Sequence, residues 1–470
     1  MSKPARLLAA APLAVTVAVT MTACVSRPGT AEAAATPAPA ATSAAASATP
    51  TQVAPTRTAA APEIPDTPAG RQLRWLLDAL TRAPVPDSEL AGHFTATFLE
   101  NIPPEQMNQV LVAFKGLRLE QITKSQDREL VALGTAGGAP YEISLSVDAT
   151  GLIDYLRFGT PKAPAPTSWA ELDERLAKVA PETGFLAAEV TGHGTCRPVH
   201  GVARRTARPL GSMFKLYVLG AVAERIRGGA FGWDTELTIT PELKSLPSGE
   251  LQDRPDGSKV TVLEAAKLMI SISDNTATDL LIHKVGRRAV ERTMRAWGGH
   301  DRRNVPFLTT RELFVLKGAD YPRYAKRYLS MRTPQRRAYL DKVVGKVPLS
   351  DITPWTSPRA LDTLEWYGSP TDVCEAYAHL AKLPDEHVGE VLSINDAGLG
   401  LDRGQWPAVW HKGGSEPGVF DMSFLARSSN GRTYVVTAMA GDPAKPLDQT
   451  RLGPELLGLV RGAFTLVKTR

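Results

Sequence analysis

Hydrophobic and polar positions divide the chain into regions of different periodicity. Residues 25–65 are mainly Ala, Pro, Thr and Ser, with almost no large apolar side chain. Such a stretch cannot bury enough surface to offset the conformational entropy lost on folding. We therefore predict a disordered tether over residues 25–65. A second Pro-rich run, Pro161–Pro166, predicts a stiff linker between two folded regions.

Residues 66–160 combine helical and alternating patterns. Apolar residues recur at helical spacing in Arg71–Thr81 and in Ser88–Phe98, which predicts helices. Four later stretches have the pattern of strands: Leu117–Ile122, Glu129–Thr135, Tyr141–Val147 and Leu152–Phe158. Helices followed by a strand meander predict a small α+β domain whose sheet curves around a helix, as in steroid-isomerase-like or cystatin-like folds.

Residues 167–470 predict one larger α/β (α+β) domain. Helices are expected at Trp169–Val179 and at Pro454–Val467. Strands are expected near both ends: Phe185–Glu189, Val199–Val202, Val409–Gly413, Asp421–Arg427 and Thr433–Ala440. A mostly helical block lies between them, from Ser212 to about Leu383. We therefore expect an antiparallel sheet built from both ends of the domain, with an inserted helical subdomain, rather than a doubly wound fold.

The amino terminus has the features of a bacterial export signal. Two basic residues precede an apolar stretch, Leu7–Thr20, that is too short to span a bilayer comfortably. The stretch leads into a Met-Thr-Ala-Cys sequence that resembles a lipobox. We predict that residues 1–24 form a lipoprotein-type signal peptide and that lipid on Cys24 holds the protein at the outer face of the cell membrane. Cleavage near residues 31–35, with secretion, is the alternative.

Composition and residue spacing argue against several classes of partner. Lys and Arg total 54 against 49 Asp and Glu, without a basic stripe, so no nucleic-acid partner is expected. The sequence has neither metal-ligand spacing nor a Gly-rich phosphate loop, so we expect no metal and no cofactor. Cys196 and Cys374 lie far apart in the sequence, and we expect two buried thiols rather than a disulfide.

A single S-x-x-K sequence, Ser212 to Lys215, opens a predicted helix. Residues three apart share a helix face, so the Lys215 amine can lie against the Ser212 hydroxyl. A desolvated lysine can lower its pKa enough to take the serine proton. The helix amino terminus also offers a backbone N–H to an oxyanion. The pattern predicts a nucleophilic serine with a lysine base.

A second motif, Ser273-Asp274-Asn275, lies between two predicted helices. The serine hydroxyl can pass a proton to a leaving group, and the asparagine amide can hold a substrate carbonyl. We expect Asp274 to fix the loop.

A third motif, Lys412-Gly413-Gly414-Ser415, lies on a predicted strand. The two glycines let a substrate backbone approach the strand edge. We expect the Ser415 N–H to complete an oxyanion hole with that of Ser212, and Lys412 to bind a carboxylate. Side chains alternate along a strand, so the neighbouring His411 should point to the opposite face from Lys412.

The three motifs occur once each, in the order typical of class A β-lactamases and penicillin-binding proteins. On these motifs, and on similar stretches such as Ser248–Gln252 and Asp274–Leu281, residues 167–470 resemble the penicillin-recognising serine hydrolases of the class A β-lactamase type. The resemblance implies the fold of that family, a substrate of the β-lactam, ester or peptidoglycan-like type, and no cofactor.

The same resemblance implies a role for each motif residue. Ser212 is the acylated nucleophile and Lys215 its activating base. Ser273 relays the proton, Asn275 positions the substrate, and Lys412 binds the substrate carboxylate.

The chain also departs from the class A pattern. Gly413 stands where the K-T-G motif has Thr, and no E-x-x-L-N sequence follows Asn275. The nearest acidic candidate, Glu312, forms with Thr309 the pattern of a helix capping box, and we expect it to cap rather than to catalyse. Without that glutamate, we expect deacylation either to be slow or to use another base.

The stretch Lys317–Tyr367 has the character of an insertion relative to class A enzymes. With the small amino-terminal domain, it resembles actinobacterial relatives of the β-lactamase-like protein of clavulanate gene clusters. We therefore expect an envelope serine hydrolase that forms an acyl-Ser212 intermediate. The alternatives are a non-catalytic envelope binding lipoprotein, or an esterase or D,D-peptidase without useful β-lactamase activity.

Overall fold

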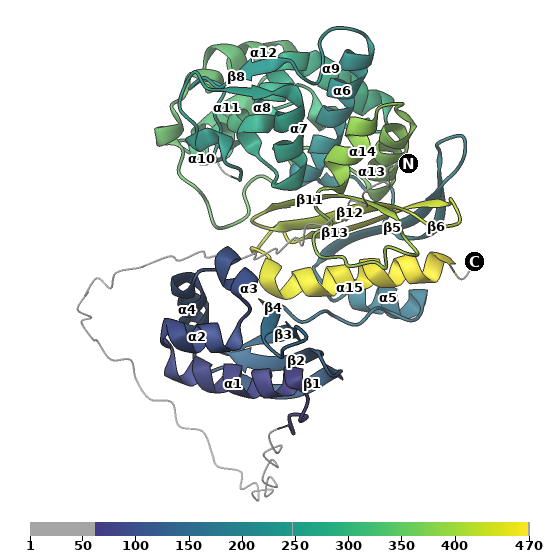
Figure 1. The fold of residues 1–470 in the computed structure, drawn as a ribbon. Helices are drawn as coiled ribbons and strands as arrows, with labels where there is room; N and C mark the ends of the chain where they lie inside the picture. The colour runs from purple at the N-terminus through teal and green to yellow at the C-terminus, as the bar shows by residue number, and fades with distance from the viewer. Residues whose placement is uncertain (1–61, 247, 469–470) are drawn as a thin grey trace, which may run out of the picture. The chain divides into compact units, whose positions relative to one another are not determined.

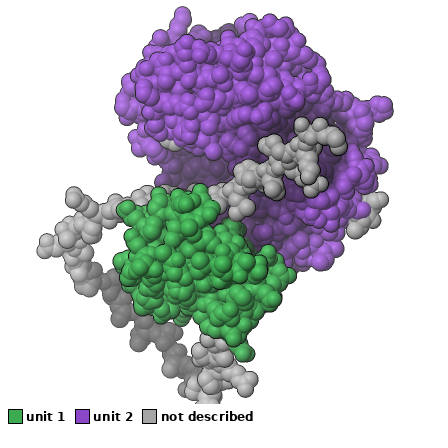
Figure 2. Space-filling view, viewed as in Figure 1, with its two compact units in different colours: residues 1–161 green, residues 162–470 purple. Residues whose placement is uncertain are grey.

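The computed structural model describes residues 62–246 and 248–468. The chain divides into two compact units, Met1–Pro161 and Lys162–Arg470 (Figure 2). The expected signal peptide with Cys24, and residues 25–61 of the expected tether, lie outside the described residues. In the described ranges, the structure contains no helix long and apolar enough to cross a membrane.

The described part of the smaller unit consists of helices followed by one antiparallel sheet (Figure 1). Its helices are α1 (Pro68–Arg82), α2 (Asp87–His93), α3 (Ala96–Asn101) and α4 (Pro104–Ala113). Its strands pair in sequence order: β1 (Arg118–Ser125), β2 (Glu129–Ala136), β3 (Ala139–Val147) and β4 (Ile153–Gly159). The predicted α+β organisation, helices and then a meander, is confirmed.

One helix prediction in this unit was wrong in detail, and one helix was not predicted. The helix expected over Ser88–Phe98 is broken, because Phe94 has an extended backbone and pairs with Ile153. The chain then restarts as α3, where the Thr95 hydroxyl accepts a hydrogen bond from the backbone N–H of Phe98. Helix α4 was missed, since only two of its ten residues are buried and its apolar pattern is weak.

The larger unit is built around a five-stranded antiparallel sheet in the order β11-β12-β13-β5-β6. Its strands are β5 (Glu182–Val190), β6 (Cys196–Val202), β11 (Ala408–Glu416), β12 (Val419–Arg427) and β13 (Thr433–Gly441). Strand β13 pairs with β5, so the two ends of the unit meet inside one sheet. Helices α5 (Trp169–Leu176) and α15 (Gln449–Lys468) cover one face (Figure 1). The predicted sheet is confirmed.

The inserted helical block covers the other face of this sheet (Figure 1). Its longer helices are α6 (Lys215–Arg227), α7 (Val262–Ser271), α8 (Asn275–Val285), α9 (Arg287–Ala296), α10 (Thr310–Gly318), α11 (Arg323–Leu329), α12 (Thr333–Lys342), α13 (Pro370–Lys382) and α14 (Glu386–Ser393). Short pieces complete it: β7 (Arg208–Pro209), η1 (Gly211–Phe214), β8 (Glu236–Thr238), η2 (Leu251–Asp253), β9 (Lys259–Thr261), η3 (Arg302–Asn304), η4 (Val344–Lys346), η5 (Leu349–Asp351) and β10 (Tyr367–Gly368).

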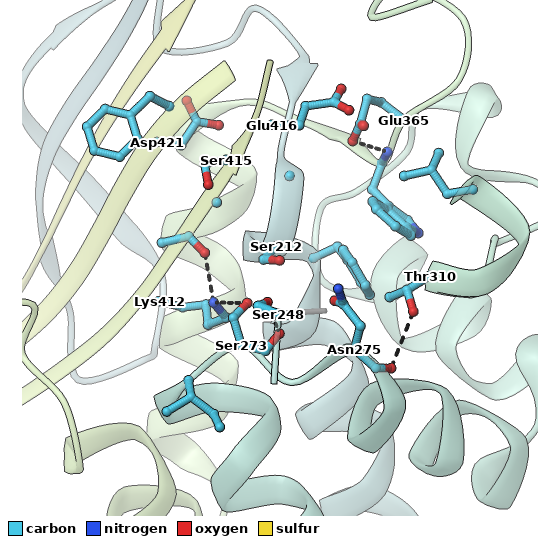
Figure 3. A pocket seen from close by; sticks show the side chains of 18 of the residues that line it. Ser212, Ser248, Ser273, Asn275, Thr310, Glu365, Lys412, Ser415, Glu416 and Asp421 are labelled. Carbon is cyan, nitrogen blue, oxygen red and sulfur yellow. Dashed lines mark hydrogen bonds between the residues drawn. The ribbon is translucent and has the colours of Figure 1, made fainter. Parts of the chain in front are cut away.

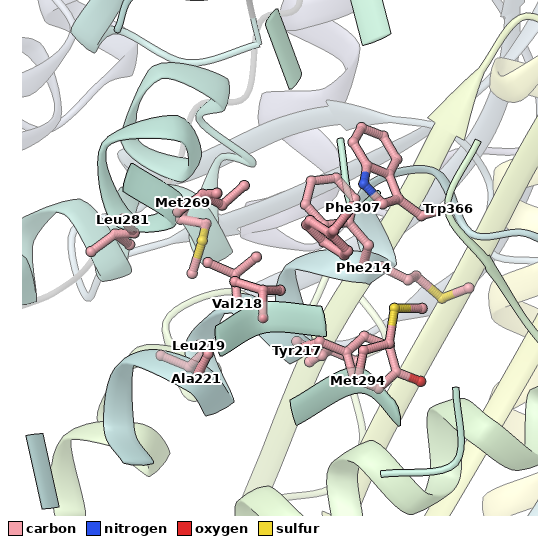
Figure 4. Packing of buried hydrophobic residues seen from close by; sticks show 14 of the residues in the cluster. Phe214, Tyr217, Val218, Leu219, Ala221, Met269, Leu281, Met294, Phe307 and Trp366 are labelled. Carbon is pink, nitrogen blue, oxygen red and sulfur yellow. The ribbon is translucent and has the colours of Figure 1, made fainter. Parts of the chain in front are cut away.

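Helix α6 is the centre of this block. Its first nine residues, Lys215–Ala223, are all buried, and apolar side chains surround it (Figure 4). Gly220 is required there, because a Cβ at this position would lie 2.1 Å from the indole ring of Trp297. A helix held on all sides is a rigid support for the Ser212 turn that precedes it.

Cys196 and Cys374 form a disulfide, so the prediction of two free thiols was wrong. Cys196 begins β6 at one edge of the sheet, and Cys374 lies on α13, which packs against β5 and β6. This packing brings their Cα atoms to 6.2 Å although 178 residues separate them in the sequence. Sequence spacing alone contains no information on that contact.

Candidate active site

Ser212 lies in the single turn η1, directly before α6. The preceding Gly211 has φ +46°, a backbone conformation that favours glycine. Among the described residues, Ser212 Oγ has no hydrogen-bond partner, and the residue lines a cavity of about 790 Å³ (Figure 3). The predicted nucleophile therefore faces a cavity large enough for a small-molecule or peptide ligand.

Lys215 is fully buried below this turn. Its Nζ lies 2.6 Å from the backbone carbonyl of Ser273, 2.8 Å from Oδ1 of Asn275 and 3.1 Å from Oγ of Ser273. Burial, and then the neighbouring charge of Lys412, hold the pKa of Lys215 well below its ordinary value. Because its pKa is lowered, the Lys215 amine stays neutral down to a lower pH than an ordinary lysine amine does. The neutral amine can accept a proton.

Ser273 joins the two lysines of the site. Its Oγ lies 3.1 Å from Nζ of Lys215. The same Oγ lies 3.1 Å from Nζ of Lys412, a contact that can be followed in Figure 3. Its backbone has φ +60°, which is unusual for a residue with a side chain, and hydrogen bonds from Lys215 and the Ser248 hydroxyl hold its carbonyl. Strain of this kind is maintained where surrounding contacts fix a functional group in place.

The other residues of the second motif begin α8. Asp274 caps that helix through Ala277 N–H and also accepts hydrogen bonds from the N–H groups of Glu250 and Leu251. It thereby fixes the loop, as expected. Asn275 is buried, and its amide donates to the carbonyl of Leu246 at 3.1 Å while its oxygen accepts from Lys215. Its predicted contact with a substrate stays a prediction.

Lys412 lies on β11, the edge strand of the sheet, and is buried. Its Nζ also donates to the carbonyl of Gly413 at 2.8 Å. Burial lowers the pKa of Lys412 to about 7. Its charge therefore changes near neutral pH, and an incoming carboxylate would favour the protonated form.

The Ser212 turn and strand β11 lie in very close contact. A Cβ at Gly211 would lie 2.8 Å from the backbone N of Ser415, and a Cβ at Gly414 would lie 2.9 Å from the backbone N of Ser212. Both positions therefore need glycine. This packing brings the two predicted oxyanion-hole N–H groups to one place beside the nucleophile.

Two predictions about neighbouring residues are confirmed. The ring of His411 stacks on Phe424 at 4.5 Å, on the face opposite Lys412. Glu312 forms the capping box with Thr309, and its carboxylate also accepts two hydrogen bonds from Arg287 at 2.6 and 2.7 Å. Both oxygens of the Glu312 carboxylate therefore already accept hydrogen bonds.

The structure also reveals a group of buried charges that the sequence analysis did not identify. Lys317, Glu365 and Glu416 form an ion-paired cluster, and Glu365, Glu416 and Asp421 line the same cavity as Ser212. The only signal in the sequence was an acidic residue next to an aromatic pair at Glu365. The antiparallel pairing of β10 with β7 brings that segment to the nucleophile turn.

Aromatic side chains form the wall of the cavity near the nucleophile. Phe214 stacks on Trp366 with ring centroids 3.7 Å apart, and the carbonyl of Trp366 accepts the N–H of Leu210. Trp355 and Phe314 extend this lining. The stretch Lys317–Tyr367 therefore borders the site.

Residues 169–350 match a family model described as the Beta-lactamase enzyme family. This part of the larger unit is therefore similar to that family. The larger unit also has the expected antiparallel sheet with an inserted helical block, which is the β-lactamase/transpeptidase-like fold. Residues 64–153 match a second model, described as the ORF 12 gene product N-terminal region, which covers most of the described part of the smaller unit. A search of curated proteins found no match.

The solved structures that are similar to this chain include PBP-A and several β-lactamases. PBP-A shares 18% identity over 65% of this chain and 100% of its own, with a TM-score of 0.43. A β-lactamase from Sphaerobacter thermophilus shares 19% identity over 64% of this chain and 97% of its own, with a TM-score of 0.45. A β-lactamase from Francisella tularensis shares 13% identity over 64% and 99%, with a TM-score of 0.42.

Among residues 62–246 and 248–468, no group of three or more His, Cys, Asp or Glu side chains is arranged to hold a metal ion.

Proposed function

We propose that the chain is a serine hydrolase that acylates Ser212 with a β-lactam, an ester or a peptide-like substrate. The observation that carries this proposal is the contact of two buried lysine amines, Lys215 and Lys412, with one hydroxyl, Ser273. Carbonyl and amide oxygens occupy the other two contacts of Lys215, and these can only accept hydrogen bonds. A neutral Lys215 has two N–H bonds for these two oxygens, which leaves its lone pair for the Ser273 hydroxyl at 3.1 Å.

The reaction follows from this arrangement. Ser212 Oγ attacks the substrate carbonyl, and its proton passes to neutral Lys215 as the new O–C bond forms. The backbone N–H groups of Ser212 and Ser415 stabilise the negative carbonyl oxygen. Lys215 then returns the proton through Ser273 to the leaving nitrogen or oxygen, and the bond to the leaving group breaks. Lys412 holds the substrate carboxylate.

Release of the acyl group requires a water molecule, which breaks the ester bond to Ser212 and leaves a carboxylic acid. Glu312, the acid nearest to the class A pattern in the sequence, is 5% exposed and paired with Arg287, so it is unavailable as a base. We therefore propose that deacylation is slow and that the acyl-enzyme accumulates.

The pairing of Glu312 with Arg287, which leaves no obvious base for deacylation, also favours a second candidate function. A protein that acylates without rapid turnover can act as a binding protein for its substrate. We propose that this alternative, an envelope lipoprotein attached through Cys24 and akin to the clavulanate-cluster relatives, applies if the acyl-enzyme does not turn over at all. The proposed envelope location rests on the export signal in residues 1–24.

Labelling with a fluorescent penicillin, together with hydrolysis of a chromogenic cephalosporin and a nitrophenyl ester, tests the proposal. We expect covalent labelling of the wild-type chain and none of Ser212→Ala, with hydrolysis by the wild type that is slow. Ser429→Ala is the matched serine control, because Ser429 is exposed in the turn between β12 and β13 and does not line the cavity. A folded wild-type protein that neither labels nor hydrolyses any of these compounds would contradict it.

A further inference from the structure

The cavity at Ser212 has two ends of different character (Figure 3). Lys412 and Ser273 line one end, and the buried Lys215 contacts that end through the Ser273 hydroxyl. At the other end, three carboxyl groups line the cavity and one ammonium lies among them. We call this second group the acidic end: Glu365, Glu416, Asp421 and Lys317.

A single cation, Lys317, forms ion pairs with two of these carboxyl groups. Lys317 Nζ lies 2.9 Å from Oε1 of Glu365 and 2.7 Å from Oε1 of Glu416. The side chains of Lys317, Glu365 and Glu416 are only 0%, 1% and 11% exposed, so solvent screens their charges weakly. Burial and the neighbouring Glu365 raise the pKa of Glu416 well above its ordinary value. These two carboxyl groups therefore share a single ammonium, so the cluster has room for a second cation.

Asp421 provides an independent observation. The residue is 2% exposed, and its Oδ1 accepts the N–H of Ala440 at 3.0 Å. Its Oδ2 is buried without a hydrogen-bond partner among the described residues. The nearby Arg208 donates instead to Glu182 and to the carbonyl of Thr183. A buried acceptor of this kind is normally paired, which indicates that a ligand group completes it.

A surplus of carboxyl groups and an unpaired acceptor fit a cationic hydrogen-bond donor. The described residues form no metal-holding group, so an organic cation fits better than a metal ion. We propose that the acidic end binds a primary ammonium group of the substrate at Asp421 and Glu416. The proposed substrate is then zwitterionic, with a carboxylate for Lys412 and a free amine at the other end. This inference rests on the proposed function, whose substrate class it narrows.

Ampicillin and penicillin G test the inference, because they differ by one amino group on the acyl side chain. Their dissociation constants are measured by calorimetry on Ser212→Ala, which cannot be acylated, at pH 6.5, where an α-amine is protonated. We expect ampicillin to bind at least about tenfold more tightly, as for a charge-assisted hydrogen bond in a buried site. N-acetylated ampicillin, which has lost the cation, should bind no better than penicillin G.

Second-site variants in the Ser212→Ala background locate the effect. Asp421→Asn and Glu416→Gln should each bring the ratio of the two dissociation constants close to one, and thermal melting shows whether either variant still folds. Glu174→Gln is the matched control, because Glu174 is an exposed acid on α5, and it should keep the wild-type ratio.

Equal binding of the two penicillins, or a preference that survives in both variants, would overturn the inference. Absence of binding by either compound would also overturn it. A different result would separate the two proposals. If the wild-type protein is not acylated but Ser212→Ala still prefers ampicillin, only the proposed function is contradicted.

Discussion

Lys215 and Lys412 both have lowered pKa values, but the proposed reaction needs one of them neutral and the other charged. Lys215 is the proposed base and must be neutral, and its pKa lies well below the ordinary value. Lys412 is the proposed carboxylate ligand and must be charged, and its pKa is about 7. Acylation therefore needs a pH high enough to deprotonate Lys215 and low enough to keep the proton on Lys412.

We predict that the second-order rate constant of acylation by penicillin G falls above about pH 7. Raising the pH through the pKa of Lys412 removes the positive charge that holds the substrate carboxylate. The fall should approach about tenfold per pH unit on the alkaline side, as expected for loss of one essential proton. The measurement is the rate of covalent labelling between pH 5 and 9.

Lys412→Arg is the matched variant for this profile, because a guanidinium keeps its charge over the whole range. Its alkaline limb should be absent even if its rate is lower throughout. A wild-type rate that stays constant to pH 9 would contradict the assigned role of Lys412.

At the residue scale, the sequence predicts the three motifs because each is a short contiguous pattern. The acidic end was not predictable in the same way. Its members Lys317, Glu365 and Glu416 are up to 99 residues apart and meet only after folding. In the sequence, Lys317 is only the first residue of the inserted stretch, and its burial and ion pairing appear only in the folded structure.

At the element scale, the close contact between turn η1 and strand β11 defines the proposed oxyanion hole. It depends on a position where a side chain does not fit, since a Cβ at Gly414 would lie 2.1 Å from the carbonyl oxygen of Leu210. A backbone neighbour cannot move aside as the end of a flexible side chain can, so the two elements would have to separate.

We predict that Gly414→Ala lowers the acylation rate by about 10²–10³-fold, the range found when one oxyanion-hole donor is lost. The added methyl group pushes the N–H of Ser212 away from that of Ser415. Labelling kinetics with the fluorescent penicillin measure the effect, and the melting temperature reports any loss of stability.

Gly192→Ala is the control for this substitution, because a Cβ at Gly192 would have no atom within 4 Å. It should label at the wild-type rate. A Gly414→Ala variant that also labels at that rate would show that the contact between η1 and β11 does not form the oxyanion hole.

The elements themselves were predictable to different degrees. Strands β12 and β13 are rich in apolar and β-branched or aromatic residues, and they were predicted correctly to within two residues at each end. The break at Phe94 was not predictable, because the local pattern continues through it and a pairing with Ile153, 59 residues later, decides the conformation. The ladder of β13 with β5 likewise depends on contacts between the two ends of the unit.

At the scale of the whole molecule, the disulfide joins the sheet of the larger unit to its helical block. It connects β6 with α13 and closes a segment of 178 residues that includes Ser212 and the second motif. A crosslink of this kind stabilises mainly by restricting the unfolded chain. It also fits the oxidising environment that the proposed export implies.

We predict that the double variant Cys196→Ser, Cys374→Ser loses about 2–5 kcal/mol of unfolding free energy, the usual range for removal of a native disulfide. Urea denaturation followed by tryptophan fluorescence measures it. Adding a reductant should lower the wild-type midpoint to that of the variant and leave the variant unchanged. A wild-type midpoint that does not respond to full reduction would contradict the prediction.

The central claim is that Ser212 becomes acylated, and intact-protein mass spectrometry of the chain mixed with penicillin G tests it most directly. The account predicts a mass increase equal to one whole penicillin, located by peptide mapping on the peptide that contains Ser212. The adduct should persist for minutes or longer and be absent from Ser212→Ala. An unmodified mass for folded wild-type protein, or an adduct that maps to another residue, would contradict the account.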